Sequence, residues 1–554
     1  MDLSDYPYTG WVIAGILGFF AVRVAIGYWA SRHVNNASDY IVAGRGLPIY
    51  MTSASIMATW FAAETLMGAS ANAYLKGFQG VIFDPFGAVL CLLVSGVFFI
   101  RLMRRARYLT VVDFFEKRFG KEVGLVGSAV QILAYLVWTA AQFVAGSIVV
   151  HTLLDWPPWV GVILVGVIVT GYTTMGGMLA DTLLDFIQMF FTAGGITAVF
   201  VCMLSAVGGV DGLLNHGGSR TVPDAFALLP LDQPHGYLGY TGFLGSLYWI
   251  AQWLAIGLGS VPTQDLMQRS MSARNEATSV WGSYFAAILY FVFGVMSPLI
   301  GIMMYKLNPS IPDEKVEGLL VLISVEYLPV WLNVLFIAAL TSAMMSTSDS
   351  AILAGASVFT ENVLPSLGKK VDDVQKLWWT RLMVIVIGAL CIGIALVIGE
   401  TYRLAMMAWS VLLVGMFVPF AFGMYWLSAN RWGALASIIG GIGTWIVGVC
   451  YYFPHTRDRH TFEGDYDFAS AMWDAVYIGC PPALTVSIVL MIVVSLATKK
   501  FDPPLPLTDA DGNLLPLTNR LGFISIRDIF RDTPEAGGQV AVAEPVAVSP
   551  PQEA

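Results

Sequence analysis

The sequence predicts an all-α protein that crosses a membrane many times. Of its 554 residues, 57% are hydrophobic and only 12% are charged, and the mean hydropathy is +0.70. A soluble protein carries about 25% charged residues, so this chain lacks the charge that several soluble domains would need on their surfaces. The net charge of −9 comes from a few loops and therefore indicates no nucleic-acid partner.

About thirteen apolar runs approach the length of roughly 20 residues that a membrane helix needs. They are centred in 9–30, 48–75, 79–102, 124–152, 157–175, 180–209, 241–265, 276–304, 329–360, 377–399, 402–427, 432–453 and 478–497. The first run has neither the basic start nor the cleavage site of a signal peptide, so we expect it to remain as a span.

Basic residues gather in every second connection between these runs. They include Arg32, Arg45, Arg101, Arg104, Arg105, Arg107, Arg118, Arg269, Arg274, Lys369, Lys370, Arg431, Lys499 and Lys500. If the runs alternate in direction, these residues share one side, which the positive-inside rule makes cytoplasmic. The N-terminus is then outside a cell membrane and the C-terminus in the cytoplasm.

The runs divide the chain into five parts. We expect an N-terminal span with a cytoplasmic loop (1–47), a first inverted repeat (48–209), a second (241–427), additional spans (428–500) and a partly disordered cytoplasmic tail (501–554). Within the tail, 520–532 interleaves apolar and basic residues, which is typical of a short helix on the inner leaflet or of a tethered loop.

Two predicted helices are interrupted at corresponding positions of the two repeats. Segment 53–77 is rich in small residues and holds Glu64, and segment 248–273 contains Gly257, Gly259 and Pro262. Proline removes a helix hydrogen bond and frees a carbonyl. Transporters built from inverted repeats bind their ligands where such helices unwind. Small residues can also serve close helix packing alone, but the matched pair favours a transporter.

Polar residues inside the spans are the candidate site residues, because ionisable groups are costly at membrane depth. The acidic ones are Glu64, Asp181, Asp185, Asp265 and Asp349. Asp181 follows a predicted turn and can equally cap a helix end.

Segment 338–357 carries the strongest polar cluster. Ala343, Ser346 and Thr347 are spaced i, i+3 and i+4 and so share one helix face. This face can offer one carbonyl and two hydroxyls to a hard cation such as Na⁺, and carbonyls of an unwound helix, here Ala58 and Phe61, can complete the shell. The same hydroxyls can instead bond to their own i−4 carbonyls.

Four motifs resemble those of the sodium:solute symporter family, which includes bacterial proline and sugar symporters and high-affinity choline transporters. They are "SDYIVAGRGLP" (38–48), "TTMGGMLADTLLDFIQ" (173–188), "PTQDLMQRSMSA" (262–273) and "SAMMSTSDSAILA" (342–354). The resemblance spans about Ser38 to about Leu427. It implies a LeuT-like fold of two inverted five-helix repeats with additional helices, and Na⁺-driven uptake of a small organic solute by alternating access.

The resemblance also implies roles for single residues. The family's sodium site falls on the carbonyls of Ala58, Phe61 and Ala343 and on the hydroxyls of Ser346 and Thr347. Its acidic ion-path residue falls on Asp185, and we expect Asp181 and Asp349 to belong to the same path. Leu184 replaces the family's usual threonine, and Asp181 replaces a usual apolar residue.

The expected solute contacts are Trp60, Glu64, Thr65, Trp138 and Thr263. Trp60 and Trp138 resemble the choline branch, whose aromatic faces attract quaternary ammonium by about 0.5–2 kcal/mol each. Thr263 stands where that branch has a tryptophan, and Glu64 resembles an acidic position of the sugar branch. An incomplete cage with a carboxylate favours a solute with a positive nitrogen and hydrogen-bond donors, such as an amine (choline) or an amino acid (proline). The alternatives are that the tryptophans only pack and that Glu64 bonds to a hydroxyl such as Thr263 or Tyr248.

Other functions remain open from the sequence. A nutrient sensor on the same scaffold would carry a long signalling domain, for which the residues after 500 are too few. A proton-coupled symporter could use Glu64 or Asp185 as carrier. We expect no enzyme, because no metal-ligand motif is present, and no disulfide framework or zinc site, because the five cysteines are scattered. The expected partners are Na⁺, the solute and the lipid bilayer, and the sequence does not predict the oligomeric state.

Overall fold

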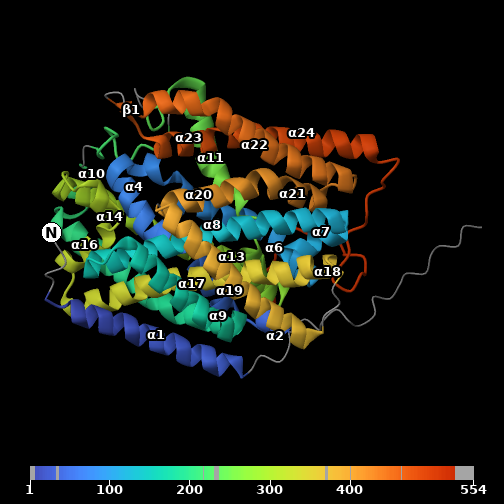
Figure 1. Ribbon diagram of the computed structural model, residues 1–554, viewed down its shortest axis with the longest axis horizontal. Helices are drawn as coiled ribbons and strands as arrows, with labels where there is room; N and C mark the ends of the chain where they lie inside the picture. The colour runs from blue at the N-terminus through green and yellow to red at the C-terminus, as the bar shows by residue number, and fades with distance from the viewer. Residues whose placement is uncertain are drawn as a thin grey trace, which may run out of the picture.

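The computed structural model describes residues 7–32, 37–215, 218–229, 236–368, 372–399, 401–462 and 465–530. In this part of the chain the fold is helical, apart from a short antiparallel hairpin of β1 (Thr461–Phe462) and β2 (Asp465–Tyr466). The long helices run roughly along one direction, side by side (Figure 1).

The helices follow the predicted runs closely. Those of the first half are α1 (Thr9–Ser31), α2 (Ala37–Val42), η2 (Ala43–Arg45), α3 (Ile49–Trp60), η3 (Glu64–Gly68), α4 (Ala69–Lys76), η4 (Gly77–Val81), η5 (Ile82–Gly87), α5 (Ala88–Val94), η6 (Ser95–Phe99), α6 (Ile100–Ala106), α7 (Val111–Phe119), α8 (Lys121–Leu154), α9 (Pro158–Ala206) and α10 (Gly209–Leu214).

The second half contains α11 (Gly242–Gly259), α12 (Gln264–Ser272), α13 (Glu276–Gly294), α14 (Met296–Leu307), α15 (Asp313–Val316), α16 (Leu319–Tyr327), α17 (Val330–Val358), η8 (Phe359–Val363), α18 (Leu364–Ser366), α19 (Asp373–Val397), α20 (Thr401–Leu412), η9 (Leu413–Phe417), α21 (Val418–Tyr425), α22 (Arg431–Arg459), α23 (Phe468–Ile478), α24 (Cys480–Thr498) and η10 (Ile526–Phe530).

Eleven helices of the described residues are long and apolar enough to cross a membrane, and Pro158–Thr174 is a shorter apolar helix. The predicted count of thirteen is therefore not confirmed. The difference arises where helices bend or break. Helix α3 has only 12 residues before its break, and Gly177, with a φ of 61°, divides α9 into a shorter and a longer part.

The first interruption follows α3. Phe61 has a ψ of 64°, and the Ala62 N–H donates to the Trp60 carbonyl at 2.9 Å rather than to the Ala58 carbonyl, as a regular helix would require. The chain then forms the π-helix η3, which begins at Glu64. Such π segments are frequent at functional sites.

The second interruption separates α11 from α12. Pro262 has no N–H to give, and Thr263 is extended with a ψ of 145°. Gly259 is required at the end of α11, because a Cβ there would lie 2.5 Å from the Trp409 carbonyl oxygen. Both interruptions lie where the sequence predicted them.

The connections gather at two ends of the molecule (Figure 1). We call the end with α2, α7 and α18 the strap end, because residues 501–530 cross it. We call the end with α10, α16 and β1 the cavity end, because a large cavity lies there. The basic connections that precede and follow α7 lie at the strap end.

Residues 501–530 form a strap across the strap end, from α24 to α13. Its carbonyls accept hydrogen bonds from side chains of several helices: Arg118 to Leu505, Tyr108 to Thr508, Arg105 to Thr518 (2.9 Å), Arg101 to Leu521 (2.9 Å), Trp281 to Ile524 (3.1 Å) and Arg274 to Ile529 (2.5 Å). Residues 520–530 are thus tethered and end in η10. Residues 531–554 of the predicted tail lie outside the described residues.

We expect the strap to stabilise the folded protein. Truncation after Lys500 removes these hydrogen bonds, each of which contributes about 1 kcal/mol net, and should lower the thermal unfolding temperature in detergent. Truncation after Phe530 keeps the strap and is the matched control. Equal unfolding temperatures for the two truncated proteins would contradict a stabilising strap.

Candidate functional site

A buried arginine on α12 lies between two carboxylates of α9. Arg269 on α12 is 1% exposed, and its Nη2 atom is 2.7 Å from Asp181 Oδ2 and 3.5 Å from Asp185 Oδ2, both on α9. The expectation that Arg269 lies in a basic loop is wrong, because α12 is buried among its neighbours. Asp181, for which a helix-capping role was the alternative, is the closer partner of Arg269.

Serine hydroxyls join these carboxylates to α3 and α17. Ser55 on α3 donates to Asp185 Oδ2 at 2.6 Å. On α17, Ser346 donates to Asp185 Oδ1 and lies 3.3 Å from Asp181 Oδ1, while Ser350 donates to Asp181 Oδ2 at 2.8 Å. The faces of α3 and α17 therefore meet at Asp185.

The five predicted sodium ligands all lie on α3, at its break, or on α17, and all are buried. They are Ala58, Phe61, Ala343, Ser346 and Thr347. The hydroxyl of Thr347 has no hydrogen-bond partner among the described residues. A buried hydroxyl without a partner costs about 1–3 kcal/mol, so this position favours an added group that binds oxygen. The Ala58 carbonyl, which loses its usual helix donor at the break, likewise favours an added group that binds oxygen.

A second buried ion pair fixes α1. Arg23, which the sequence analysis did not single out, bonds to Asp349 on α17, and its Nη1 donates to the Ser342 carbonyl at 2.9 Å. Thr173 donates to the other oxygen of Asp349 at 2.9 Å. A cavity of about 30 Å³ is lined by Arg23, Asp181 and Asp349, which is room for a water molecule. Asp349 thus belongs to a neighbouring pair and not directly to the Asp181–Asp185 network.

Three indole rings gather beside the first break. Trp409 on α20 lies with its ring centroid 6.1 Å from that of Trp60 and 4.8 Å from that of Trp138. Asp265 accepts from Trp60 Nε1 and from the Tyr135 hydroxyl, both at 2.7 Å. Trp409 was not predicted as a site residue, because nothing in its own apolar run distinguishes it from a packing residue.

Glu64 lies at the same place. Its carboxylate accepts from Trp138 Nε1 and, at 2.9 Å, from Gln142 Nε2, and it forms no ion pair within the described part of the chain. The predicted alternative partners were wrong. Thr263 donates to the Ser260 carbonyl at 2.8 Å, and Tyr248 donates to Asp474 at 2.7 Å, because each lies nearer to those acceptors.

The structure thus brings Trp60, Glu64 and Trp138 together but turns the other two predicted solute contacts elsewhere. Thr65 donates to Asp84, 2.6 Å away on η5, and Thr263 bonds within its own turn. Asp84 was missed because its run was treated as a plain apolar span, although an acidic residue in such a run is itself a signal.

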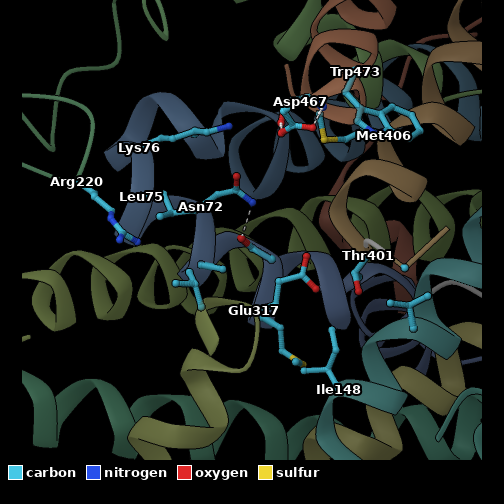
Figure 2. Close-up of a pocket in the computed structure, with 18 of the residues that line it drawn as sticks. Asn72, Leu75, Lys76, Ile148, Arg220, Glu317, Thr401, Met406, Asp467 and Trp473 are labelled. Carbon is cyan, nitrogen blue, oxygen red and sulfur yellow. Dashed lines mark hydrogen bonds between the residues drawn. The ribbon is translucent and has the colours of Figure 1, made fainter. Parts of the chain in front are cut away.

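A large cavity of about 1740 Å³ lies at the cavity end. Figure 2 shows Asn72 and Lys76 of α4, Glu317 and Thr401 around it. Its lining includes Met67 and Gly68 of η3, so the cavity reaches the first broken helix one turn from Glu64. Its rim includes Trp159, which is 59% exposed.

Comparison with known proteins gives a consistent result. A family model for the sodium:solute symporter family matches residues 40–441. The human high affinity choline transporter 1 is 25% identical over 455 residues, which are 79% of this chain and 76% of that protein. The sodium/glucose cotransporter of Vibrio parahaemolyticus is 25% identical over 457 residues, with 76% and 82% covered.

Solved structures show the same fold. A Na⁺-coupled sialic acid symporter in a substrate-bound outward-open state has a TM-score of 0.69 and 20% identity, covering 88% of this chain and 98% of its own. MhsT in complex with L-phenylalanine has a TM-score of 0.50 and 14% identity, with 81% and 98% covered. Both are LeuT-fold transporters, and the predicted fold class is confirmed.

Proposed function

The chain belongs to the sodium:solute symporter family, and from this premise we propose that it couples the uptake of a small organic solute to the entry of Na⁺ by alternating access. The main support for a Na⁺ site is the buried hydroxyl of Thr347, which has no hydrogen-bond partner among the described residues. It stands one residue from Ser346, whose hydroxyl bonds to Asp185. Three kinds of oxygen, from carbonyl, hydroxyl and carboxylate, are thus available to a hard cation.

The charges support a cation at this place. Asp181 and Asp185 face one arginine, Arg269, so the network is net negative when both carboxyls are ionised. In a site with little water, that charge attracts a cation strongly. We therefore assign the Na⁺ ligands to Ala58, Phe61, Ala343, Ser346 and Thr347, with Asp185 as the carboxylate that the ion passes.

We expect Thr347→Val and Ser346→Ala to weaken Na⁺ activation of uptake in proteoliposomes roughly 5- to 150-fold, since one lost ligand costs about 1–3 kcal/mol. Ser348→Ala is the matched control on the same helix, because the Ser348 hydroxyl donates to the Met344 carbonyl at 2.8 Å and should not contact the ion. Measurement at fixed pH separates Na⁺ from proton coupling. Equal Na⁺ activation in Thr347→Val and Ser348→Ala would reject the site.

For the solute we propose a small molecule with a positively charged nitrogen, either an amine such as choline or an amino acid such as proline. The support is the grouping of Trp60, Trp138 and Trp409 around a carboxylate that lacks an ion pair among the described residues. Aromatic faces attract cations, and the Glu64 carboxyl adds a negative charge when it is ionised. The relationship to choline transporters agrees with this class, whereas the relationship to a sodium/glucose cotransporter keeps sugars in the screen.

Glu64→Gln keeps the size of the side chain and removes its charge. We expect it to lower the affinity for a cationic or zwitterionic solute at least tenfold, about 1.4 kcal/mol, with Na⁺ binding less affected. The solute is first identified by thermal-shift screening of amines, amino acids, sugars and carboxylates, with and without Na⁺. Glu326→Gln, on the exposed side of α16, is the control. Wild-type affinity in Glu64→Gln would leave Glu64 as a structural acceptor for Trp138 and Gln142.

We further propose that the strap end faces the cytoplasm and the cavity end the outside, because the basic connections lie at the strap end. Leu214 at the end of α10 and Leu367 after α18 are both 64% exposed. In a protein without its native cysteines, a cysteine at position 214 should react with an impermeant thiol reagent applied outside, and one at position 367 should not. The reverse labelling pattern would invert the orientation.

A further inference from the structure

A third buried carboxylate, outside both the charge network and the indole cluster, lies on η5. Asp84 is 1% exposed and forms no ion pair within the described residues. A charge buried without a partner is costly in a protein interior, and more so at membrane depth. What Asp84 contacts are the oxygens of its neighbours, all close to the first broken helix.

Four oxygen-bearing groups form one tight cluster. The Thr65 hydroxyl lies 2.6 Å from Asp84 Oδ2, and the Tyr290 hydroxyl lies 3.0 Å from Asp84 Oδ1. The two hydroxyls also bond to each other. Both reach the carbonyl of Trp60, the last residue of α3, at 3.0 Å from Thr65 and 3.2 Å from Tyr290.

The protons available do not suffice for these contacts when Asp84 is ionised. Thr65 and Tyr290 hold one hydroxyl proton each, so an ionised Asp84 leaves two protons for the six oxygen–oxygen contacts of the cluster, and a protonated Asp84 supplies a third. A protonated Asp84 completes a relay in which the carboxyl donates to Tyr290, Tyr290 to Thr65, and Thr65 to the Trp60 carbonyl. An ionised Asp84 instead draws both hydroxyl protons to itself, and the carbonyl at the break loses its donors.

We propose that Asp84 is a proton-binding site that exchanges its proton against Na⁺ at the first broken helix. The inference rests on the proposed Na⁺ site, because Phe61, which follows Trp60, is one of its carbonyl ligands. The Phe61 ring also packs edge-on against Tyr290, with centroids 5.6 Å apart. A positive charge bound at Phe61 favours the ionised carboxylate nearby. The Asp84 carboxyl gives up its proton to solvent as Na⁺ enters, so one positive charge replaces another.

The elements packed against η5 are η3, η4, α5, α11 and α13. They carry few titratable side chains whose protonation could be confused with that of Asp84. On η3 the titratable group is Glu64, and on α13 Tyr290 lies at the cluster, whereas Glu276, which bonds to Arg101 and Arg105, lies at the strap end of α13. Helices η4, α5 and α11 contain no Asp, Glu, Lys, Arg or His; their titratable side chains are Cys91 and Tyr248. Glu64 is therefore the one carboxyl whose titration must be separated from that of Asp84.

Because linkage is reciprocal, a proton that Na⁺ expels must also oppose Na⁺ binding. The apparent Na⁺ affinity should fall as pH falls, by up to about tenfold per pH unit where one proton is exchanged. Asp84→Asn copies the shape of the protonated acid and cannot ionise. The Na⁺ affinity of this variant should therefore stay constant over the pH range in which that of the wild type changes.

The experiment measures proton release directly. NaCl is added to purified protein in weakly buffered detergent solution with a pH-indicating dye, and KCl serves as the ionic-strength control. The wild-type protein should release up to about one proton per molecule and Asp84→Asn none; release that persists in Asp84→Asn but is lost in Glu64→Gln would assign the proton to Glu64 and overturn the proposal. Asp474→Asn is the matched control, since Asp474 is a buried carboxylate bonded to His460 and Tyr240 near the hairpin β1–β2. Release from Asp84→Asn equal to that of the wild type, or no release from the wild type, would overturn the proposal.

Thermal shift by Na⁺ keeps the two proposals separate. If Na⁺ fails to stabilise the wild-type protein at any pH, the proposed Na⁺ coupling fails. If Na⁺ stabilises it equally at all pH values and releases no proton, only the Asp84 site fails. Should Asp84→Asn not fold, Tyr290→Phe tests the same relay, because it keeps the carboxyl and removes its link; it should alter the pH dependence of Na⁺ affinity. An unaltered dependence in Tyr290→Phe would then reject the relay.

Discussion

The position of Arg269 is the constraint on which the rest of the site depends. Its guanidinium bonds to Asp181 on α9, while its Nε donates to the carbonyl of Ser55 on α3 at 3.1 Å. Arg269 thereby ties the second broken helix to the first and to the acidic face of α9. Removing one partner from such a buried pair costs about 3–5 kcal/mol. Asp185, which also bonds to Arg269, accepts hydrogen bonds from the serine face of α17 and from α3. It thereby fixes the distance between these two helices.

Broken helices leave main-chain carbonyls without donors, and in a membrane every such group needs a partner inside the protein. Side chains from distant helices supply several of them here. The hydroxyls of Thr65 and Tyr290 lie within hydrogen-bond distance of the Trp60 carbonyl, and Gln131 donates to the Pro262 carbonyl. Within the described residues, no side chain donates to the Ala58 carbonyl at the end of α3, and the Thr347 hydroxyl on α17 has no hydrogen-bond partner. These two oxygens, on different helices, thus remain available to an added group that binds oxygen.

Periodicity and composition predicted what depends on one segment at a time. The apolar runs gave the helices, the glycines and Pro262 gave the second break, and the spacing of Ser346 and Thr347 gave a hydroxyl face. What could not be predicted depends on the approach of separate segments. Arg269 looks like a loop residue because it follows a polar stretch, and only the packing of α12 under its neighbours buries it. Arg23 bonds to Asp349, which lies more than three hundred residues away in the sequence. Trp409 contacts the other indole rings only because of where α20 packs.

The two ends of the molecule differ in how firmly they are closed. At the cavity end a space of about 1740 Å³ reaches η3. At the strap end, Glu276 on α13 bonds to Arg101 and Arg105 on α6, and the strap covers both helices while it remains attached to α24. Helix α24 packs against α22, whereas α6 packs against α13, and the strap connects these helices at the same end of the molecule. Ligands shift such an equilibrium only by their differential affinity for its two states. A shift toward a state in which the strap end is open therefore requires bound ligands to have a higher affinity for that state, with a difference in binding free energy that offsets the contacts that are broken.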